Sequence, residues 1–196
     1  MSELPRIAAI ILAAGRSTRM GARNKLLEDV GGQPMVRRVA EAALASRARP
    51  IWVVVGHQAV AVGEALSGLP IALVDNPRPA AGISGSLKLG IGALPADCDG
   101  ALILLADMPQ ITSAHIDRLI AAFAPSTIVV PTHQGRRGNP VLWPAGRFAQ
   151  MLRLQGDVGA KRLLAAHAAE VREVDLATEA IFADVDTPEA LARLRR

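Results

Sequence analysis

Residues 12 to 27, which read LAAGRSTRMGARNKLL, combine small, hydroxyl-bearing and basic side chains directly after an apolar stretch. Guanidinium groups match the oxygens of a phosphoryl group with a fork of donors, and a lysine adds a point charge. Backbone amides of the loop supply further donors. The segment therefore predicts a phosphate-binding loop, whose cations are Arg16, Arg19, Arg23 and Lys25.

The spacing of this loop excludes two common phosphate-binding designs. Gly15 and Gly21 enclose five residues and Lys25 comes four positions after Gly21, whereas a Walker A loop has one residue fewer between its glycines and continues directly to lysine. Ser17 stands where the dinucleotide fingerprint needs its second glycine. A loop with charged side chains as well as backbone donors suits a triphosphate whose α-phosphorus is attacked.

Two acidic motifs occur further along the chain. LILLADMP places Asp107 just past a predicted buried strand, and open α/β sheets bind ligands at that end of their strands. FADVDTPE carries Asp184 and Asp186 two positions apart, on one face of an extended segment. By itself, Asp107 also fits a helix-entry residue, and Asp186 also fits the cap of the last helix. As metal ligands, these carboxylates favour a hard, oxygen-preferring ion.

The stretch NPRPAAGISGSLKLG begins at Asn76 and combines a proline-rich loop with a helix that starts at Ser84 or Ser86. Small residues such as Gly82 let a ligand approach the backbone, and the amides of a helix N-terminus bind polar edges or phosphates. A helix that is merely capped explains the same residues. Both interpretations remain open on the residues alone.

Taken together and in this order, the motifs resemble those of the molybdenum cofactor nucleotidyltransferases, and the resemblance covers nearly the whole chain. The cytidylyltransferase branch is the most similar, because guanylyl-transferring relatives carry LAGG where this chain has Leu12, Ala13, Ala14 and Gly15. The resemblance implies one domain, residues 1–196, with an α/β, Rossmann-like nucleotide-diphosphosugar transferase fold. That fold has a mostly parallel sheet, helices on both faces and a small β-hairpin lid.

The activity that the resemblance implies is transfer of CMP from CTP to the terminal phosphate of molybdopterin cofactor, with release of pyrophosphate. Mg²⁺ is the implied cofactor, bound by Asp107 with Asp186 as the second carboxylate, and Lys25 and Arg19 are the implied catalytic cations. A molybdoenzyme or its chaperone is an implied transient partner. The implied nucleotide-binding residues are Leu12, Ala13, Ala14, Gly15, Arg16, Ser17, Gly21, Asn76, Gly82, Ser84 and Ser86.

Two further motifs are implied to bind the cofactor substrate. GRRGNPVLW is similar to the family segment G-x-R-G-x-P and offers Arg137, Gly138 and Asn139, although many relatives carry histidine in place of the asparagine. GDVGAK is similar to G-D-x-G-A-R, with Lys161 in place of the arginine, which keeps the charge but loses the bidentate fork. Asp157 in this motif is equally compatible with a helix cap.

The implied reaction needs no general base. Its nucleophile is a phosphate monoester with a second pKa of about 6, which is largely ionised at neutral pH. Positioning and charge stabilisation then supply the catalysis. The alternatives are a sibling transferase that uses GTP or another acceptor, such as a sugar phosphate, an alditol phosphate or a flavin, and a non-catalytic carrier of the finished cofactor.

Apolar runs and amphipathic patterns alternate along the chain, which predicts a mostly parallel, doubly wound sheet. The expected strands are 7–13, 51–55, 71–74, 101–105, 127–131 and 171–175. The expected helices are 35–45, 59–67, 84–94, 113–123, 158–169 and one that begins near residue 187. The segment HQGRRGNPVLW between them is expected to form a hairpin or lid rather than another crossover.

Length and composition fit one globular domain of 196 residues with a formal net charge of +4. The longest apolar run is too short to span a bilayer, and the N-terminus does not resemble a secretory signal. Cys98 is the only cysteine, so a reducing, cytoplasmic location is expected. The chain has no tyrosine and no basic block, which argues against nucleic acid as a partner.

Overall fold

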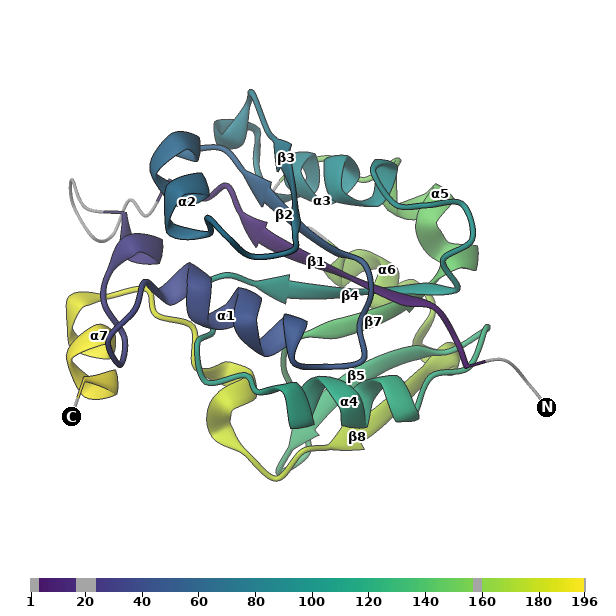
Figure 1. Ribbon diagram of the computed structural model, residues 1–196. Coiled ribbons are helices and arrows are strands. Elements are labelled where there is room, and N and C mark those ends of the chain that lie inside the picture. The colour runs from purple at the N-terminus through teal and green to yellow at the C-terminus, as the bar shows by residue number, and fades with distance from the viewer. Residues whose placement is uncertain (1–3, 17–23, 157–159, 196) are drawn as a thin grey trace.

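The computed structural model describes residues 4–16, 24–156 and 160–195. Its centre is a single sheet with helices on both faces (Figure 1), which confirms the predicted α/β architecture. The strands follow the order β3-β2-β1-β4-β7-β5-β6, and β8 pairs with β5. They are β1 Ile7–Ala13, β2 Ile51–Val55, β3 Ala72–Asp75, β4 Gly100–Leu105, β5 Ile128–His133, β6 Arg136–Arg137, β7 Val141–Pro144 and β8 Val171–Asp175.

The first four strands form one parallel group, and β5 and β8 form a second parallel pair. β1 lies between β2 and β4, with Leu12 opposite Val54 on one side and Leu105 on the other. Because parallel strands point in the same direction, their carboxyl ends meet at one edge. In Figure 1 this edge lies to the left, where α7 and the segment before α1 are also found.

The segment expected to form a hairpin or lid divides into two parts. β5 and β6 form the expected hairpin, in which His133 pairs with Arg136. β7, in contrast, enters the sheet between β4 and β5 and pairs antiparallel with β4, so that Ile103 faces Val141. Its four residues are all buried. A segment that was predicted to belong to a hairpin or lid is therefore a central strand of the sheet.

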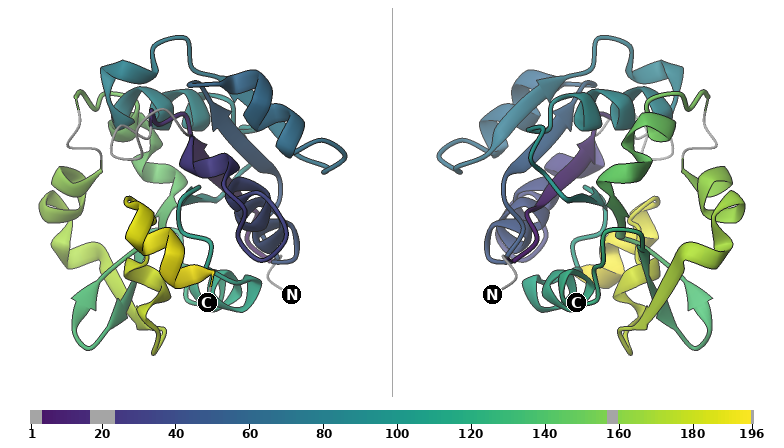
Figure 2. Two further views of the ribbon diagram at one scale, coloured as in Figure 1. Left: turned by 90° about the vertical axis from the view of Figure 1, so that its left-hand side faces the viewer. Right: turned by 90° about the vertical axis from the view of Figure 1, so that its right-hand side faces the viewer.

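Helices cover both faces, and the alternation of side chains along β1 separates the two cores. Ile11 and its odd-numbered neighbours face α1, α2 and α4, whereas Ile10 faces α3, α5 and α6. The side views of Figure 2 show the helices on either side of the sheet. The α-helices are α1 Met35–Leu44, α2 Ala59–Ala65, α3 Ile83–Gly92, α4 Ser113–Ala121, α5 Phe148–Met151, α6 Lys161–Ala166 and α7 Pro188–Leu194.

Several helices end one to three residues earlier than predicted, and two differ at their start. α3 begins at Ile83 with Gly82 as its N-cap, so neither Ser84 nor Ser86 starts the helix. Gly82 has a φ of 93°, a conformation that glycine adopts without strain. The helix expected over 158–169 is the shorter α6, followed by a 3₁₀ turn at Ala168–Glu170.

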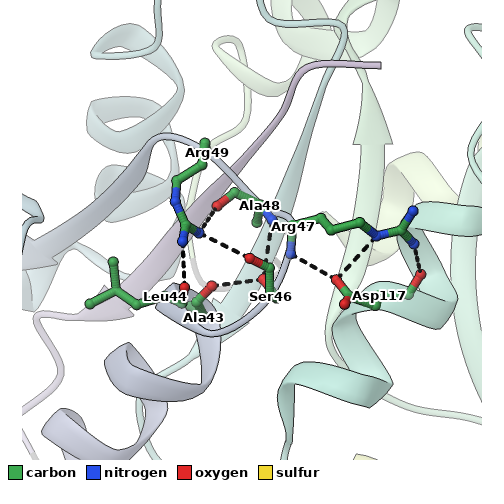
Figure 3. Close-up of polar contacts among 7 residues, drawn as sticks. All are labelled: Ala43, Leu44, Ser46, Arg47, Ala48, Arg49 and Asp117. Atoms are coloured by element: carbon green, nitrogen blue, oxygen red, sulfur yellow. Dashed lines mark hydrogen bonds and ion pairs between the residues drawn. The ribbon is translucent and has the colours of Figure 1, made fainter. Parts of the chain in front are cut away.

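The C-terminus of α1 is closed by an arginine from the following loop (Figure 3). Arg49 donates to the carbonyl of Leu44, the last residue of α1, and to the loop carbonyls of Ser46 and Ala48. Arg47 from the same loop pairs with Asp117 of α4. The loop thereby ties α1 to α4 at the edge opposite the carboxyl ends of the parallel strands.

Among the described residues, no helix combines the length and the apolar character that crossing a bilayer requires.

Candidate active site

Two carboxylates and one ammonium group meet at the carboxyl edge of the parallel strands. Lys25 Nζ lies 2.5 Å from Asp107 Oδ2 and 2.5 Å from Asp186 Oδ1. The side chains are 11% exposed for Lys25, 19% for Asp107 and 33% for Asp186. Asp107 and Asp186 lie 82 and 161 positions after Lys25 in the sequence. The fold brings the three residues into one cluster, here called the Lys25–Asp107–Asp186 triad.

Each carboxylate is held by a local feature of the fold. Asp107 follows β4, and the backbone N–H of Ala106 donates to the carbonyl of Leu12 in β1. The C-terminal segment joins it there, because Val185 N–H donates to the carbonyl of Asp107 at 2.9 Å and the Val185 side chain is buried. Asp186 is therefore fixed beside Asp107 by its own neighbour in the chain.

The cap of α7 is formed by Thr187, whose hydroxyl accepts from Ala190 N–H. Asp186 is therefore not needed as a helix cap, and its side chain contacts Lys25 instead. Of the two interpretations that the sequence left open for Asp186, the structure favours a place in the site.

Lys25 is positioned by the short 3₁₀ helix Lys25–Leu27, which Asn24 caps by accepting from Leu26 N–H. Burial by itself lowers the pKa of Lys25, but the charges of Asp107 and Asp186 and their hydrogen bonds outweigh burial and raise that pKa above 10.5. A raised pKa in the folded state gives stability that is fully present below the unfolded pKa and is lost as pH rises through the folded value. Lys25 is therefore a cation throughout the neutral range.

The triad fits a divalent metal with few protein ligands. Asp107 Oδ1 is buried and has no hydrogen-bond partner in the described part of the chain, which leaves one carboxylate oxygen for an ion. The described residues contain no group of three or more His, Cys, Asp or Glu side chains that could hold a metal by themselves. Two carboxylates completed by phosphate oxygens and water are the arrangement that Mg²⁺ prefers.

A cavity of about 320 Å³ adjoins Asp107. Among the described residues, no atom lies within 4 Å of where a Cβ at Gly15 would stand, and glycine has no side chain to fill that space. The walls are otherwise small or apolar. The lining residues are Leu12, Ala14, Gly15, Pro79, Gly82, Ile83, Ser86, Leu105 and Asp107.

Asn76 and Ser84, two other predicted nucleotide-binding residues, support this cavity without lining it. Asn76 Nδ2 donates to Ser86 Oγ at 2.9 Å, and Asn76 Oδ1 accepts from Arg78 N–H. Ser84 Oγ donates to the carbonyl of Gly156 and so ties α3 to the segment that precedes α6. Asn76 and Ser84 are both buried.

A second cavity, of about 380 Å³, shares Leu12, Ile83 and Leu105 with the first. Its other walls are mostly apolar and come from β4, β7, α6 and the segment before α7. Its polar side chains are Asn139, Lys161 and Asp184; its further lining residues are Leu87, Ile103, Met108, Val141, Trp143, Ala160, Leu164, Ile181 and Phe182.

The remaining predicted residues fall into three groups. Arg137 pairs with Glu173, and Gly138 packs on Ile181, so neither lines the two cavities. Ala13 is buried in the core and Arg16 is exposed; neither is among the described residues that line these two cavities. Ser17, Arg19, Gly21 and Asp157 lie outside the described residues.

Sequence reasoning missed several lining residues. Asp184 was considered only for the metal, and it lies instead at the second cavity. Phe182 and Trp143 stand at the ends of the motifs FADVDTPE and GRRGNPVLW, but neither was singled out, because an apolar residue in a cavity wall has the same sequence signature as one in the core. Pro79 lies within the quoted proline-rich stretch, and that stretch was the available signal.

Residues 9–171 match the family model described as the MobA-like NTP transferase domain. The chain belongs to the MobA-like NTP transferase family. It is 32% identical over 203 residues to purine catabolism protein PucB of Bacillus subtilis, covering 98% of this chain and 97% of PucB. It is 29% identical over 201 residues to nicotine blue oxidoreductase of Paenarthrobacter nicotinovorans, covering 98% of each chain.

Other similarities differ in extent. The chain spans only 24% of the bifunctional protein GlmU of Kineococcus radiotolerans, to which it is 39% identical over 120 residues. Among solved structures, Rv0371c of Mycobacterium tuberculosis H37Rv superposes with a TM-score of 0.85 at 26% identity, covering 99% of both chains. That protein has also been solved as a complex with manganese.

Gly138 of the MobA-like domain tests the contact between the β5–β6 hairpin and the segment before α7. A Cβ at this position would lie 2.4 Å from the carbonyl oxygen of Ile181, whose backbone cannot yield without moving the cavity wall. Gly138→Ala is expected to lower the free energy of unfolding by about 1–3 kcal/mol, measured by urea denaturation. Gly146→Ala, where a Cβ meets nothing within 4 Å, is the matched control and should be near neutral. Equal stability of the two variants would contradict the proposed packing role.

Proposed function

We propose that this protein is a Mg²⁺-dependent cytidylyltransferase that transfers CMP from CTP to the terminal phosphate of molybdopterin cofactor. In the reaction an oxygen of the acceptor phosphate forms a bond to the α-phosphorus of CTP. The bond between that phosphorus and the bridging oxygen to the β-phosphate breaks, and pyrophosphate leaves. The observation that carries the proposal is the Lys25–Asp107–Asp186 triad beside a cavity bounded by the first glycine of the loop.

The residues of the triad have distinct roles in this proposal. Asp107 and Asp186 hold the metal, which when bound neutralises charge on the phosphates. Lys25 donates to phosphate oxygens as negative charge moves toward the leaving pyrophosphate, together with Arg19 and the loop amides. The manganese complex of Rv0371c supports a divalent ion as cofactor. No protein base is assigned, because the acceptor phosphate is already ionised at neutral pH.

The preference for cytosine is supported by the hydrogen bonding of Ser86. Because Ser86 Oγ accepts from Asn76 Nδ2, the hydroxyl proton is left to donate toward the cavity. The pairing edge of cytosine presents two acceptors, O2 and N3, and one amino donor, whereas that of guanine presents one acceptor, O6, and two N–H donor groups. Asp107 carries the only side-chain carboxylate among the described lining residues of that cavity, and we assign it to the metal. Ala13 and Ala14 favour the same base through the family resemblance.

The second cavity supports a flat heterocyclic acceptor more than a sugar phosphate. A sugar ring presents several hydroxyl groups, and each loses hydrogen bonds to water when it is buried without a partner. Three polar side chains, Asn139, Lys161 and Asp184, stand among apolar walls that include Trp143 and Phe182. We assign the acceptor to this cavity, with Lys161 near its phosphate. Transfer of the product to a molybdoenzyme or its chaperone belongs to the same proposal.

The proposal is tested by thermal unfolding with CTP, GTP, ATP or UTP in the presence of Mg²⁺. A ligand that binds the folded protein stabilises it by RT ln(1 + [L]/Kd), so CTP is expected to raise the melting temperature most. Adding molybdopterin cofactor should then release pyrophosphate only with the preferred nucleotide. A shift with GTP alone would overturn the cytosine assignment. Saturable cofactor binding without any nucleotide-dependent product would instead support a carrier.

A further inference from the structure

The ammonium group of Lys25 lies between the two carboxylates that we assign to the metal. Its Nζ contacts one oxygen of each at 2.5 Å, and the lysine side chain is only 11% exposed. The backbone of Lys25 is held by a capped 3₁₀ helix, and the next residue, Leu26, is anchored in the core. The positive charge of Lys25 therefore already balances part of the negative charge of Asp107 and Asp186.

A divalent metal that bound the pair through its remaining oxygens, such as Asp107 Oδ1, would lie next to the ammonium at a large electrostatic cost. Metal–oxygen distances of about 2.0–2.1 Å would bring a dication close to the ammonium group. Two like charges at such a separation repel strongly in a partly buried site. The ammonium must therefore leave the carboxylates before both of them can bind a metal.

The triphosphate offers Lys25 a new set of anionic oxygens next to its present position. Asp107 lines the cavity assigned to the nucleotide, so the carboxylate pair and the phosphates share one boundary. Moving the ammonium to the phosphates takes its charge away from both carboxylates, and the incoming metal replaces that positive charge. Exchange of one cation for another thus needs the metal and the nucleotide together.

We propose that Lys25 is the resident counter-ion of the Asp107–Asp186 pair, and that it keeps divalent metal out until a nucleotide draws it away. The metal then enters with the nucleotide rather than before it. This inference rests on the proposed function only for the assignment of the two carboxylates to the metal. It does not depend on which base or which acceptor the enzyme uses.

The test measures binding of Mn²⁺ alone, without nucleotide, by electron paramagnetic resonance of the free ion. Lys25→Met is expected to bind Mn²⁺ at least about tenfold more tightly than the wild type, because the competing cation is gone. Lys88→Met is the matched control, since Lys88 on α3 makes no ion pair with the described residues and lines neither cavity. The control should bind Mn²⁺ as weakly as the wild type. The gain should disappear in Lys25→Met/Asp107→Asn.

A second variant keeps the test valid if the methionine variant folds poorly. Lys25→Gln retains a donor but no charge, and it should also bind Mn²⁺ more tightly than the wild type. Equal affinity of the wild type and both neutral variants, including binding too weak to detect in all three, would overturn the inference. Failure of the proposed function would appear separately. In that case the wild type would release no pyrophosphate from any nucleotide, while Lys25→Met would still bind Mn²⁺ more tightly than the wild type.

Discussion

Replacing Lys25 by alanine is expected to reduce turnover by about 10²–10³-fold, the usual loss when one donor to the developing charge is removed. The ammonium is charged throughout the neutral range and contacts Asp107, which lines the cavity that we assign to the nucleotide. In the proposed mechanism, loss of this group removes a donor to the phosphates. Pyrophosphate release at saturating nucleotide and metal measures the effect, and circular dichroism checks that the variant remains folded.

Lys25→Arg is the informative companion to the alanine variant. It keeps the charge, but the larger planar guanidinium must fit a site in which the lysine side chain is only 11% exposed. Turnover is therefore expected to stay well below that of the wild type. Near-normal turnover of Lys25→Ala would remove Lys25 from the catalytic role, whatever the arginine variant does.

Asp107→Asn is expected to lower turnover by about 10³-fold, and more severely than Asp186→Asn. Asp107 is the less exposed of the two, at 19% against 33%, and its buried Oδ1 has no partner among the described residues. An amide keeps the shape but removes the charge that holds a hard cation. The dependence of turnover on Mn²⁺ concentration should shift to higher concentrations in both variants.

The geometry predicts which of the two variants loses more turnover. If both aspartates act on the metal, excess Mn²⁺ should restore part of the turnover of Asp186→Asn and less of that of Asp107→Asn. A result in which Asp186→Asn is the more damaged enzyme would show that the assignment of the principal metal ligand is reversed.

Local sequence patterns were sufficient for much of the fold. Apolar runs such as Ile7–Ala13 and Ile51–Val55 match the observed strands, because a strand buried on both faces must be apolar throughout. The antiparallel insertion of β7 was not predictable in the same way. Its pairing with β4 depends on where the hairpin directs the chain, and residues 141–144 carry no local signal for a central position.

The charged residues of the candidate site could be predicted from the sequence, whereas the residues that line its cavities were predicted less well. Lys25, Asp107 and Asp186 are charged residues in recognisable motifs, and the structure brings all three together. Arg137 and Asn139 come from one motif, yet of these two only Asn139 is among the described residues that line the two cavities. Whether a residue of a hairpin faces inward or outward is set by the packing of both strands, which one sequence window does not contain.

The antiparallel strand β7 also has a consequence for the order in which this domain is made. β1, β2, β3 and β4 can pair with one another once residue 105 has been synthesised, because all their mutual partners are then present. The free edge of β4 stays open until residues 141–144 emerge, and only then does β5 gain its place beside β7. During synthesis, the centre of the finished sheet is therefore first an exposed edge, and exposed edges are where nascent chains pair with the wrong strands.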